Sequence, residues 1–364
     1  MAQETLLDKA RKIINRVDSE MRELFIERMR AAEMVAEYKK ERGLPILDGA
    51  REDEVIRRNS EAVEDEVIRE YYVNFLKNNM SVSRAYQSRL MEGLRVAYSG
   101  TEGAFAHIAA EKLYPSAIKV AYGSFKEAYR AVELGECELA VLPVENSYNG
   151  EVGQVTDLMF SGSLYVNGMF DLPVTQDLLG VPGASLSDIK KVISHPQALG
   201  QCAKYIAAHG FSRGEYENTA LAAKEVATLG DKTVGAIASA EAAELFGLAV
   251  LDHDINESKS NTTRFAVFSR VANKRVNNEH GVHSILFFTV RNEAGALAKA
   301  VDVIGSHGFN MRSLRSRPMK DLLWQYYFYV EAEGNVQTEV GGNMMEELGE
   351  YCDRLKFVGT YIKF

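Results

Sequence analysis

Basic residues interrupt an otherwise apolar seam in the N-terminal part of the sequence. Seam residues recur at alternating spacings of three and four, which is typical of one face of a long helix. They are Leu7, Ala10, Ile14, Val17, Met21, Leu24, Arg28, Ala31, Val35 and Tyr38. Because a buried cation without a partner is costly, Arg28 at this core position indicates a site that binds an anion. The alternative, an arginine whose stem packs while its head reaches water, stays open at this point.

Other polar residues of this region have spacings that suit the same site. Lys39 lies eleven residues after Arg28, three turns along nearly the same helix face. Ser83 and Gln87 are one turn apart, so their side chains point the same way. The pair at 51–52 adds a further arginine and a glutamate. Since guanidinium groups bind carboxylates in a two-pronged fashion, the set suits a small polyanion.

As a set these residues resemble the all-helical chorismate mutase domain of bifunctional chorismate mutase/prephenate dehydratases. The matching positions are Arg11, Arg28, Lys39, Asp48, Arg51, Glu52, Ser83 and Gln87. The resemblance implies that Arg11 and Arg28 bind carboxylates of chorismate and that Lys39 and Gln87 act catalytically at its ether oxygen. The other positions then serve the remaining carboxylate and hydroxyl contacts. The rearrangement to prephenate needs no nucleophile or general base, so the site has only to hold the compact conformer and stabilise developing charge.

Helix length limits how such a site can be built. Arg11 and Arg28 are separated by 17 positions, which is about 26 Å along a helix axis. They cannot both hold one small molecule. We therefore predict a homodimer with exchanged helices, in which Arg11 of one chain completes the site of the other.

Four short motifs lie in the middle of the chain, each just after a predicted strand. They are residues 100–105 (GTEGAF), 145–147 (ENS), 194–197 (SHPQ) and 261–265 (NTTRF). Ligands collect at such strand ends in open α/β sheets, and N–H groups at the following helix starts bind anions. Taken singly, Thr263 and Arg264 also fit as ordinary residues at the start of a strand. Ser194 fits as the cap of a helix that begins near Pro196.

In their order these motifs resemble the prephenate dehydratases over residues 95 to 270. The resemblance implies a two-lobed α/β domain, similar to periplasmic binding proteins, that converts prephenate to phenylpyruvate. It implies Thr263 as the catalytic donor to the departing hydroxyl and Arg264 as a carboxylate ligand. The whole implied substrate-binding set is Glu145, Asn146, Ser147, Thr263, Arg264 and Phe265. Aromatisation drives this reaction, so we expect no cofactor and no metal.

Some positions depart from the family pattern. Thr101, Ala104 and Ala106 stand where the family often has Pro, Thr and Ser, and Gln176 stands where we expect His. These changes concern substrate contacts rather than the class of reaction. Arogenate, which carries an amine in place of the ketone, stays open as a second substrate.

The segment from residue 281 onward has its own pattern, with strand, helix, strand, strand, helix and strand in order. This order is typical of a ferredoxin-like sandwich, and the segment resembles the ACT regulatory domains. The resemblance implies phenylalanine as an effector, bound through Gly295, Ala296, Leu297, Asn310, Arg315, Ser316 and Arg317. Arg315 replaces the acid of the family motif Glu-Ser-Arg-Pro. We expect phenylalanine to inhibit the dehydratase more than the mutase.

Three successive regions must position these residues. Residues 1–92 are predicted to be helical, with a break at Gly43 and Pro45. Residues 94–272 alternate short apolar strands with helices, which predicts a mostly parallel sheet. A polar linker over 273–280 leads to the regulatory domain at 281–364. The predicted fold is therefore multidomain, with an all-α, a two-lobed α/β and a βαββαβ part.

Composition supports a globular protein that acts on small molecules. Of 364 residues, 46% are hydrophobic, and 42 Lys and Arg face 51 Asp and Glu for a net charge of −9. An acidic chain has no general attraction for nucleic acid or anionic membranes. The three cysteines form no CxxC pair, and the sequence shows neither an apolar leader nor a membrane-length apolar run. We therefore predict a cytoplasmic protein.

Two other functions stay open on the sequence. Paired α/β lobes also suit a non-catalytic protein that binds amino acids, although such a protein needs no mutase residues. The departures at Ala104 and Gln176 would fit a mutase whose dehydratase has lost activity.

Overall fold

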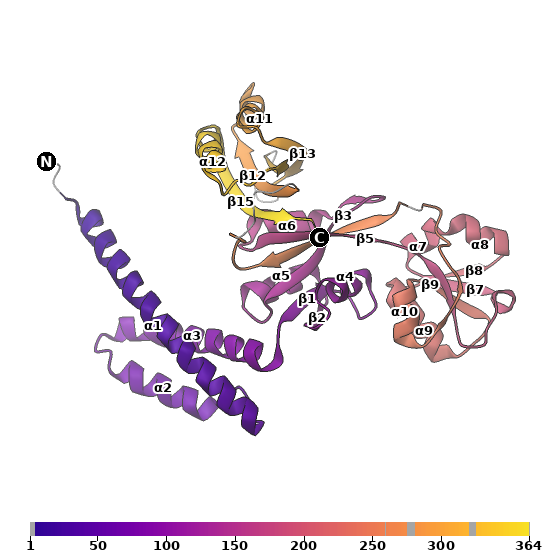
Figure 1. Cartoon of the computed structure of the whole chain (residues 1–364), viewed down its shortest axis with the longest axis horizontal. Helices are drawn as coiled ribbons and strands as arrows, with labels where there is room; N and C mark the ends of the chain where they lie inside the picture. Colours follow the sequence, from indigo (N-terminus) through magenta and orange to yellow (C-terminus); the bar gives the residue numbers. More distant parts are fainter. Residues whose placement is uncertain (1–3, 259, 275–280, 320–324, 364) are drawn as a thin grey trace. The chain divides into compact units, whose positions relative to one another are not determined.

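The computed structural model describes residues 4–258, 260–274, 281–319 and 325–363. The chain divides into two compact units, Met1–Leu94 and Arg95–Phe364. The first unit is helical, as predicted, and consists of α1 (Leu6–Arg42), α2 (Gly49–Glu61) and α3 (Glu66–Glu92) (Figure 1). Residues 275–280 of the predicted linker lie outside the described residues. No helix in the described ranges is both long and apolar enough to cross a membrane.

Local signals account for the ends of α1. The helix begins with a capping box, in which the side chains of Thr5 and Asp8 each accept a backbone N–H of the other. It ends at Gly43, whose positive φ of 62° closes the last turn as predicted. Among the residues of α1, only Ala32 and Ala36 are buried. Most of its apolar seam is therefore exposed in a single chain.

The second unit contains a two-lobed α/β region. The first lobe consists of β1 (Arg95–Ser99), α4 (Phe105–Leu113), β2 (Ile118–Tyr122), α5 (Phe125–Glu133), β3 (Leu139–Asn146), β4 (Gly150–Glu151), α6 (Gly153–Ser161), β5 (Tyr165–Pro173) and β11 (Thr262–Ser269). Its strands are ordered β2-β1-β3-β11-β5, with β4 paired to β3. Strands β1 and β3 are largely buried, which matches their apolar sequences, whereas the edge strand β2 is partly exposed.

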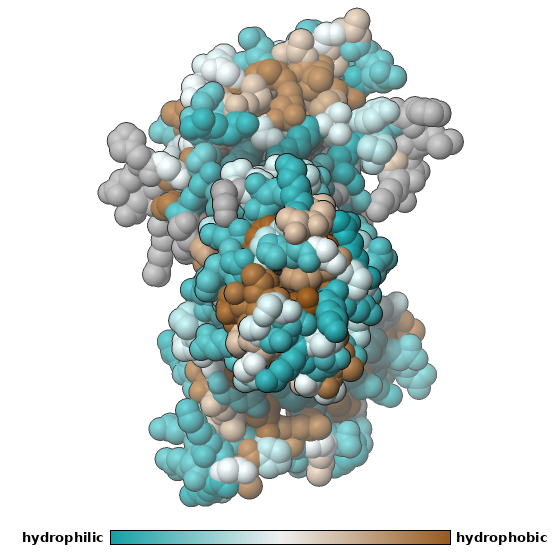
Figure 2. Space-filling view, turned by 90° about the vertical axis from the view of Figure 1, so that its right-hand side faces the viewer, coloured by the Kyte–Doolittle hydropathy of each residue, from teal (hydrophilic) through white to brown (hydrophobic). Residues whose placement is uncertain are grey.

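The chain builds the second lobe between β5 and β11. This lobe consists of β6 (Asp177–Gly180), a short 3-10 helix (Leu186–Asp188), β7 (Lys191–Ser194), α7 (Pro196–Gln201), α8 (Ala203–His209), β8 (Ser212–Glu215), α9 (Thr219–Leu229), β9 (Val234–Ala238), α10 (Ala240–Phe246) and β10 (Ala249–Asp252). Its strand order is β10-β6-β9-β7-β8. The face of the molecule drawn in Figure 2 mixes hydrophilic and hydrophobic residues.

The prediction of mostly parallel sheets is wrong. β1 runs parallel to β2 and β3, and β7 runs parallel to β8 and β9. However, β11 is antiparallel to both β3 and β5, and β6 is antiparallel to β9 and β10. The physical reason is the path of the chain: it returns from the second lobe through β11, which enters the first sheet from the opposite end.

A separate four-stranded sheet, here called the C-terminal sheet, completes the second unit. Its elements follow the predicted order and are β12 (Val282–Val290), α11 (Ala296–Ser306), β13 (Asn310–Pro318), β14 (Tyr326–Glu333), α12 (Glu339–Tyr351) and β15 (Cys352–Ile362). The strands pair antiparallel in the order β13-β14-β12-β15. Helices α11 and α12 cover one face (Figure 1), and their apolar core includes Leu286 and Phe288.

The other face of the C-terminal sheet packs on the first lobe. Ile285 and Phe287 of β12 share one hydrophobic core with residues of α5, α6 and β5. The rings of Phe160 and Tyr327 stack with centroids 4.2 Å apart. Strand β15 passes so close to β5 that a Cβ at Gly359 would lie 2.0 Å from the carbonyl oxygen of Val166. The two parts are therefore packed as one body.

Candidate active sites

A cavity of about 250 Å³ in the helical unit gathers most of the first predicted set. Seven of the eight predicted residues line it, namely Arg28, Lys39, Asp48, Arg51, Glu52, Ser83 and Gln87. Val35, Ile46, Val55, Met80 and Arg84 complete the wall. Arg11 does not line this cavity. The structure therefore brings together the predicted residues of α1, α2 and α3 except the one at the far end of α1.

Hydrogen bonds hold the cations of this cavity in place. The Arg28 guanidinium donates to the hydroxyl of Ser83 and, at 3.4 Å, to the carbonyl of Asn79. Burial lowers the pKa of Arg28, an effect that the nearby charge of Glu52 opposes. Lys39 donates to the carbonyl of Ile46. Arg28 and Lys39, both on α1, thus line the same cavity.

Some of the residues predicted to contact the substrate in this cavity already interact with other groups of the protein. Asp48 is the N-cap of α2, where its carboxylate accepts the backbone N–H of Arg51 at 3.1 Å. The Arg51 side chain is 55% exposed and pairs with Glu54 at 2.6 Å. Gln87 is buried, and its amide oxygen has no hydrogen-bond partner in the described structure. A bound molecule that donates a hydrogen bond, such as one with a hydroxyl group, could complete the hydrogen bonding of this oxygen.

Sequence reasoning missed Arg84. This side chain lines the cavity and pairs with Glu52 across α2 and α3. A signal was present, because Met80, Ser83, Arg84 and Gln87 have the spacing of one helix face. With Arg84 the cavity carries four cations against two carboxylates, which favours a dianion.

A second cavity, of about 470 Å³, lies between the two lobes. Asn146, Thr263 and Phe265 of the second predicted set line it. Glu145, Ser147 and Arg264 do not. In the described parts of the chain, no group of three or more His, Cys, Asp or Glu is arranged to hold a metal ion.

Asn146 organises the hydroxyl of Thr263. The two residues are paired across β3 and β11, and the Asn146 amide donates to Thr263 Oγ1 at 2.9 Å. The same amide donates to Asn261, while its oxygen accepts the N–H groups of Tyr148 and Asn149. Because Thr263 Oγ1 accepts from Asn146, its own hydrogen is available for donation into the cavity.

Helix starts surround this cavity. Its lining includes residues at the N-termini of α4, α6, α7 and α9. Neither α4 nor α6 has a side-chain hydrogen bond at its cap, so backbone N–H groups there can bind an anion. The described lining contains no lysine or arginine, and its carboxylates are Glu151 and Glu217. Anion binding here therefore depends on backbone groups.

The structure does not place Arg264 at the cavity. Neighbouring residues of a strand point to opposite faces, so Thr263 faces the cavity and Arg264 faces the C-terminal sheet. Arg264 pairs with Asp171 at 2.9 Å and with Glu331 at 3.7 Å. Although burial acts to lower it, these carboxylates raise the pKa of Arg264 above its ordinary value. On the same side, Glu145 accepts from Arg315 at 2.7 Å.

The predicted cap of α7 is wrong by one residue. His195, not Ser194, is the N-cap, and its Nδ1 accepts the N–H of Gln197 at 3.2 Å. Ser194 is buried and donates to the carbonyl of Ile237 at 2.5 Å. Since Nδ1 accepts, neutral His195 carries its hydrogen on Nε2. His195 lines the cavity, in keeping with the place of the 194–197 motif after a predicted strand, and so does the buried Gln176, a position expected to concern substrate contacts.

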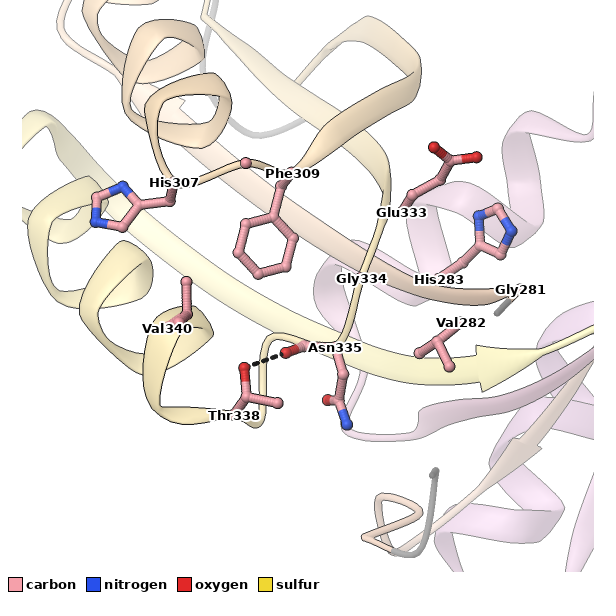
Figure 3. A pocket seen from close by; sticks show the side chains of 11 residues that line it. Gly281, Val282, His283, His307, Phe309, Glu333, Gly334, Asn335, Thr338 and Val340 are labelled. Carbon is pink, nitrogen blue, oxygen red and sulfur yellow. Dashed lines mark hydrogen bonds between the residues drawn. The ribbon is translucent and has the colours of Figure 1, made fainter. Parts of the chain in front are cut away.

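A third cavity, of about 480 Å³, lies in the C-terminal sheet (Figure 3). Phe309 and Val340 border it, and the Thr338 hydroxyl donates to the carbonyl of Asn335 at 2.8 Å. None of the predicted effector residues lines this cavity. Gly295 is the N-cap of α11 with a φ of 83°, ahead of Ala296 and Leu297.

Three of the four polar members of the predicted effector set have side-chain partners elsewhere. Asn310 donates to Glu333 at 2.7 Å. The Arg315 and Arg317 guanidinium groups, on either side of Ser316, reach carboxylates of the first lobe.

Two protein families match separate parts of the chain. Residues 96–273 match the prephenate dehydratase family, and residues 10–88 match the chorismate mutase type II family. A bifunctional chorismate mutase/prephenate dehydratase of Aquifex aeolicus is 32% identical over 98% of both chains. An arogenate dehydratase/prephenate dehydratase of Arabidopsis thaliana is 34% identical over 74% of this chain and 72% of its own.

Two solved structures share the fold of the second unit with a TM-score of 0.68 each. One is a prephenate dehydratase from Arthrobacter aurescens in complex with L-Phe, which is 25% identical over 74% of this chain and 90% of its own. The other is GqqA, described as a novel type of quorum quenching acylase, which is 31% identical over 74% of this chain and 98% of its own.

Proposed function

The chain belongs to the family of bifunctional chorismate mutase/prephenate dehydratases, and on this basis we propose how its two cavities carry the two reactions. The protein rearranges chorismate to prephenate and converts prephenate to phenylpyruvate, which are steps of phenylalanine biosynthesis. The observation that supports this division of work is that each compact unit holds its own cavity, lined by polar residues suited to one of the two reactions.

In the helical unit, the cations bind the two carboxylates of chorismate and favour its compact conformer. Arg28, oriented by Ser83, binds one carboxylate. Lys39 and the amide of Gln87 stabilise the negative charge that grows on the ether oxygen as its bond to the ring breaks. No proton is transferred in this step, so the site needs positive charge and shape rather than an acid or a base.

A second copy of the chain completes the mutase site. Arg11 does not line the cavity of its own chain, and the apolar seam around it is exposed: Leu7 and Ile14 are each 56% exposed and Leu24 is 64% exposed. Exposed apolar seams of this kind are buried by pairing with another helix. A dimer with exchanged α1 helices covers the seam and supplies Arg11 to the partner's cavity.

In the cavity between the lobes, Thr263 acts on the departing hydroxyl of prephenate. The bond between the ring and its carboxylate breaks and leaves its electron pair in the ring as CO2 departs. The bond to the hydroxyl breaks at the same time, and the departing oxygen takes up one proton, supplied by solvent, and leaves as water. Thr263, held by Asn146, donates a hydrogen bond to this oxygen as negative charge develops on it. The aromatic ring that forms supplies the driving force, and no cofactor takes part.

Backbone groups bind the carboxylates of prephenate. The uncapped starts of α4 and α6 offer N–H groups, and Phe265 offers an apolar wall for the ring. This arrangement replaces the contact with Arg264 that the sequence predicts. Arogenate is a second candidate substrate, because Glu217 at the cavity wall suits an ammonium group. Parallel assays with prephenate and arogenate compare the two.

The C-terminal sheet acts as a regulatory domain. Its βαββαβ order is the ferredoxin-like arrangement of the ACT domains, and we assign the domains to residues 1–92, 94–272 and 281–364. Phenylalanine is its effector and inhibits the dehydratase. The three cysteines are unpaired in the structure, which suits the reducing cytoplasm.

One assay tests the two activities together. The full chain is supplied with chorismate, and phenylpyruvate is followed through its absorbance in base. The expected result is phenylpyruvate formation without added cofactor. Prephenate that accumulates without phenylpyruvate would leave only the mutase, and chorismate that stays intact would contradict both activities.

A further inference from the structure

An arginine of the C-terminal sheet reaches the wall of the cavity between the lobes. Arg317 on β13 pairs with Glu151 at 3.3 Å between Nη1 and Oε2. Glu151 lines that cavity, and its side chain is only 19% exposed. The second oxygen of Glu151 is buried and has no hydrogen-bond partner in the described structure. Arg317 is therefore the cation that pairs with this carboxylate, and the charge of the nearby Arg315 also acts on it.

The position of Arg317 is fixed by further contacts. Its Nε donates to Asp157 at 3.2 Å and to the hydroxyl of Tyr327 at 3.0 Å, and that hydroxyl donates to Asp157 at 2.6 Å. The guanidinium also lies against Gly153, where a Cβ would come within 2.4 Å of Nη1. Glycine leaves room for this approach at the start of α6, and a Cβ there would require the guanidinium to shift. The arginine is thus held in one place between β13 and the first lobe.

The pairing of Arg317 with Glu151 matters because the lining of the cavity is acidic and the substrate is an anion. The described lining holds the carboxylates Glu151 and Glu217 and no lysine or arginine, while prephenate carries two carboxylates. Like charges brought together in a partly buried site repel strongly. Without a counter-ion, the carboxylate of Glu151 would oppose substrate binding at the α6 start, where the backbone N–H groups are.

We propose that Arg317 is a positioning residue of the dehydratase, which removes the charge of Glu151 from the cavity and so lets the C-terminal sheet set the affinity for prephenate. The proposal rests on the dehydratase function proposed above. The same ion pair offers a physical route by which the C-terminal sheet could regulate the dehydratase. A shift of β13 away from α6 would separate Arg317 from Glu151 and weaken the binding of a dianion without touching Thr263.

The test uses the full chain and the variants Arg317→Gln, Glu151→Gln and the double variant. We expect Arg317→Gln to raise KM for prephenate about tenfold, with kcat within about twofold, because the released charge acts on binding. The double variant should return KM to within about twofold of wild type, since the opposing charge is gone. Added salt should reduce the defect of the single variant.

Arg312→Gln is the matched control. Arg312 lies on the same strand and is 60% exposed, and its carboxylate partner, Glu333, belongs to the C-terminal sheet rather than to the lobe. It should leave KM and kcat unchanged. The mutase rate of each preparation reports the integrity of the separate helical unit. Arg317→Lys serves if Arg317→Gln does not fold, because a point charge should give an intermediate KM that Glu151→Gln corrects.

The outcomes separate the proposal from the function on which it rests. A double variant as poor as Arg317→Gln would assign Arg317 a merely structural role through Asp157 and overturn the proposal. An unchanged KM in Arg317→Gln would overturn it as well. Wild-type protein that does not consume prephenate would instead overturn the dehydratase function, and the proposal with it.

Discussion

The amide of Asn146 donates a 2.9 Å hydrogen bond to the hydroxyl oxygen of Thr263, across two strands that the sequence separates by 115 residues. The strand pairing sets this geometry, because β3 and β11 lie side by side only after the chain has built the second lobe. The bond uses the acceptor capacity of Thr263 and leaves its hydrogen for the substrate.

Replacing Thr263 by valine should lower kcat for prephenate by about 10²- to 10⁴-fold, because the variant keeps the shape but loses the hydroxyl. KM should change little, since the carboxylates bind elsewhere. Thr263→Ser should keep a substantial part of the activity. Steady-state kinetics with prephenate measure both, and the mutase rate of the same samples is the control. A valine variant with wild-type kcat would exclude Thr263 as the donor.

Mixing two inactive mutase variants should restore activity. Arg11→Ala and Arg28→Ala should each lack mutase activity alone, because every site of either homodimer lacks one arginine. A mixed dimer with exchanged helices contains one intact site, so a fully exchanged equal mixture should reach about a quarter of wild-type activity. Chorismate consumption before and after subunit exchange measures this. Verified mixed dimers without any recovery would contradict a shared site.

Phenylalanine should inhibit the dehydratase more than the mutase. The C-terminal sheet shares its hydrophobic core with the first lobe, whereas the mutase cavity belongs to the other compact unit. Both rates are measured in one preparation with phenylalanine up to the millimolar range, and calorimetry reports binding. If phenylalanine neither binds nor slows prephenate turnover, the effector role is lost, and the change at Arg315 becomes the first position to examine.

Because the folded chain resists protonation of His107, the second unit should become less stable as the pH decreases. Its Nδ1 accepts the N–H of Gly103 at 3.2 Å and so supports the turn ahead of α4. Burial lowers the pKa of His107 below its ordinary value of 6.5, although Glu111 acts in the opposite direction. Below about pH 6.5 the unfolded chain binds a proton that the folded chain resists, so the free energy of unfolding falls as the pH decreases.

The size of this effect has an upper limit. One such group changes the free energy of unfolding by at most about 1.4 kcal/mol per pH unit. Denaturation of wild type and His107→Gln between pH 5 and 8 measures the difference. The gap between the two proteins should depend on pH only below about 6.5. A gap that stays constant over this range would show that His107 does not titrate on unfolding.

The helical unit is the part that the sequence predicted best, because its signals are local. The seam, the break at Gly43 and the helix-face spacing all refer to residues a few positions apart. The same reasoning applied to Ser83 and Gln87 could have added Arg84, which lies on their face of α3. Arg11 could be excluded from its own cavity by helix length alone.

The site between the lobes was predicted less completely, because its geometry depends on long-range pairing. Alternation along a strand could have shown that Thr263 and Arg264 face opposite sides. It could not have shown which side holds the cavity. That choice depends on the C-terminal sheet. Its Glu331 forms an ion pair with Arg264, and the arginines of its strand β13 form ion pairs with carboxylates of the first lobe. Neither contact is visible in the spacing of the motifs.

The contact of Gly359 with Val166 limits how this protein can be recombined. A C-terminal segment taken from a relative would meet the backbone of β5 at this point, and any side chain in place of Gly359 would collide with it. Deleting the segment would uncover the edge of β5, and unpaired strand edges attract other chains. Swaps of this segment among relatives should therefore succeed only with donors that bring their own glycine there.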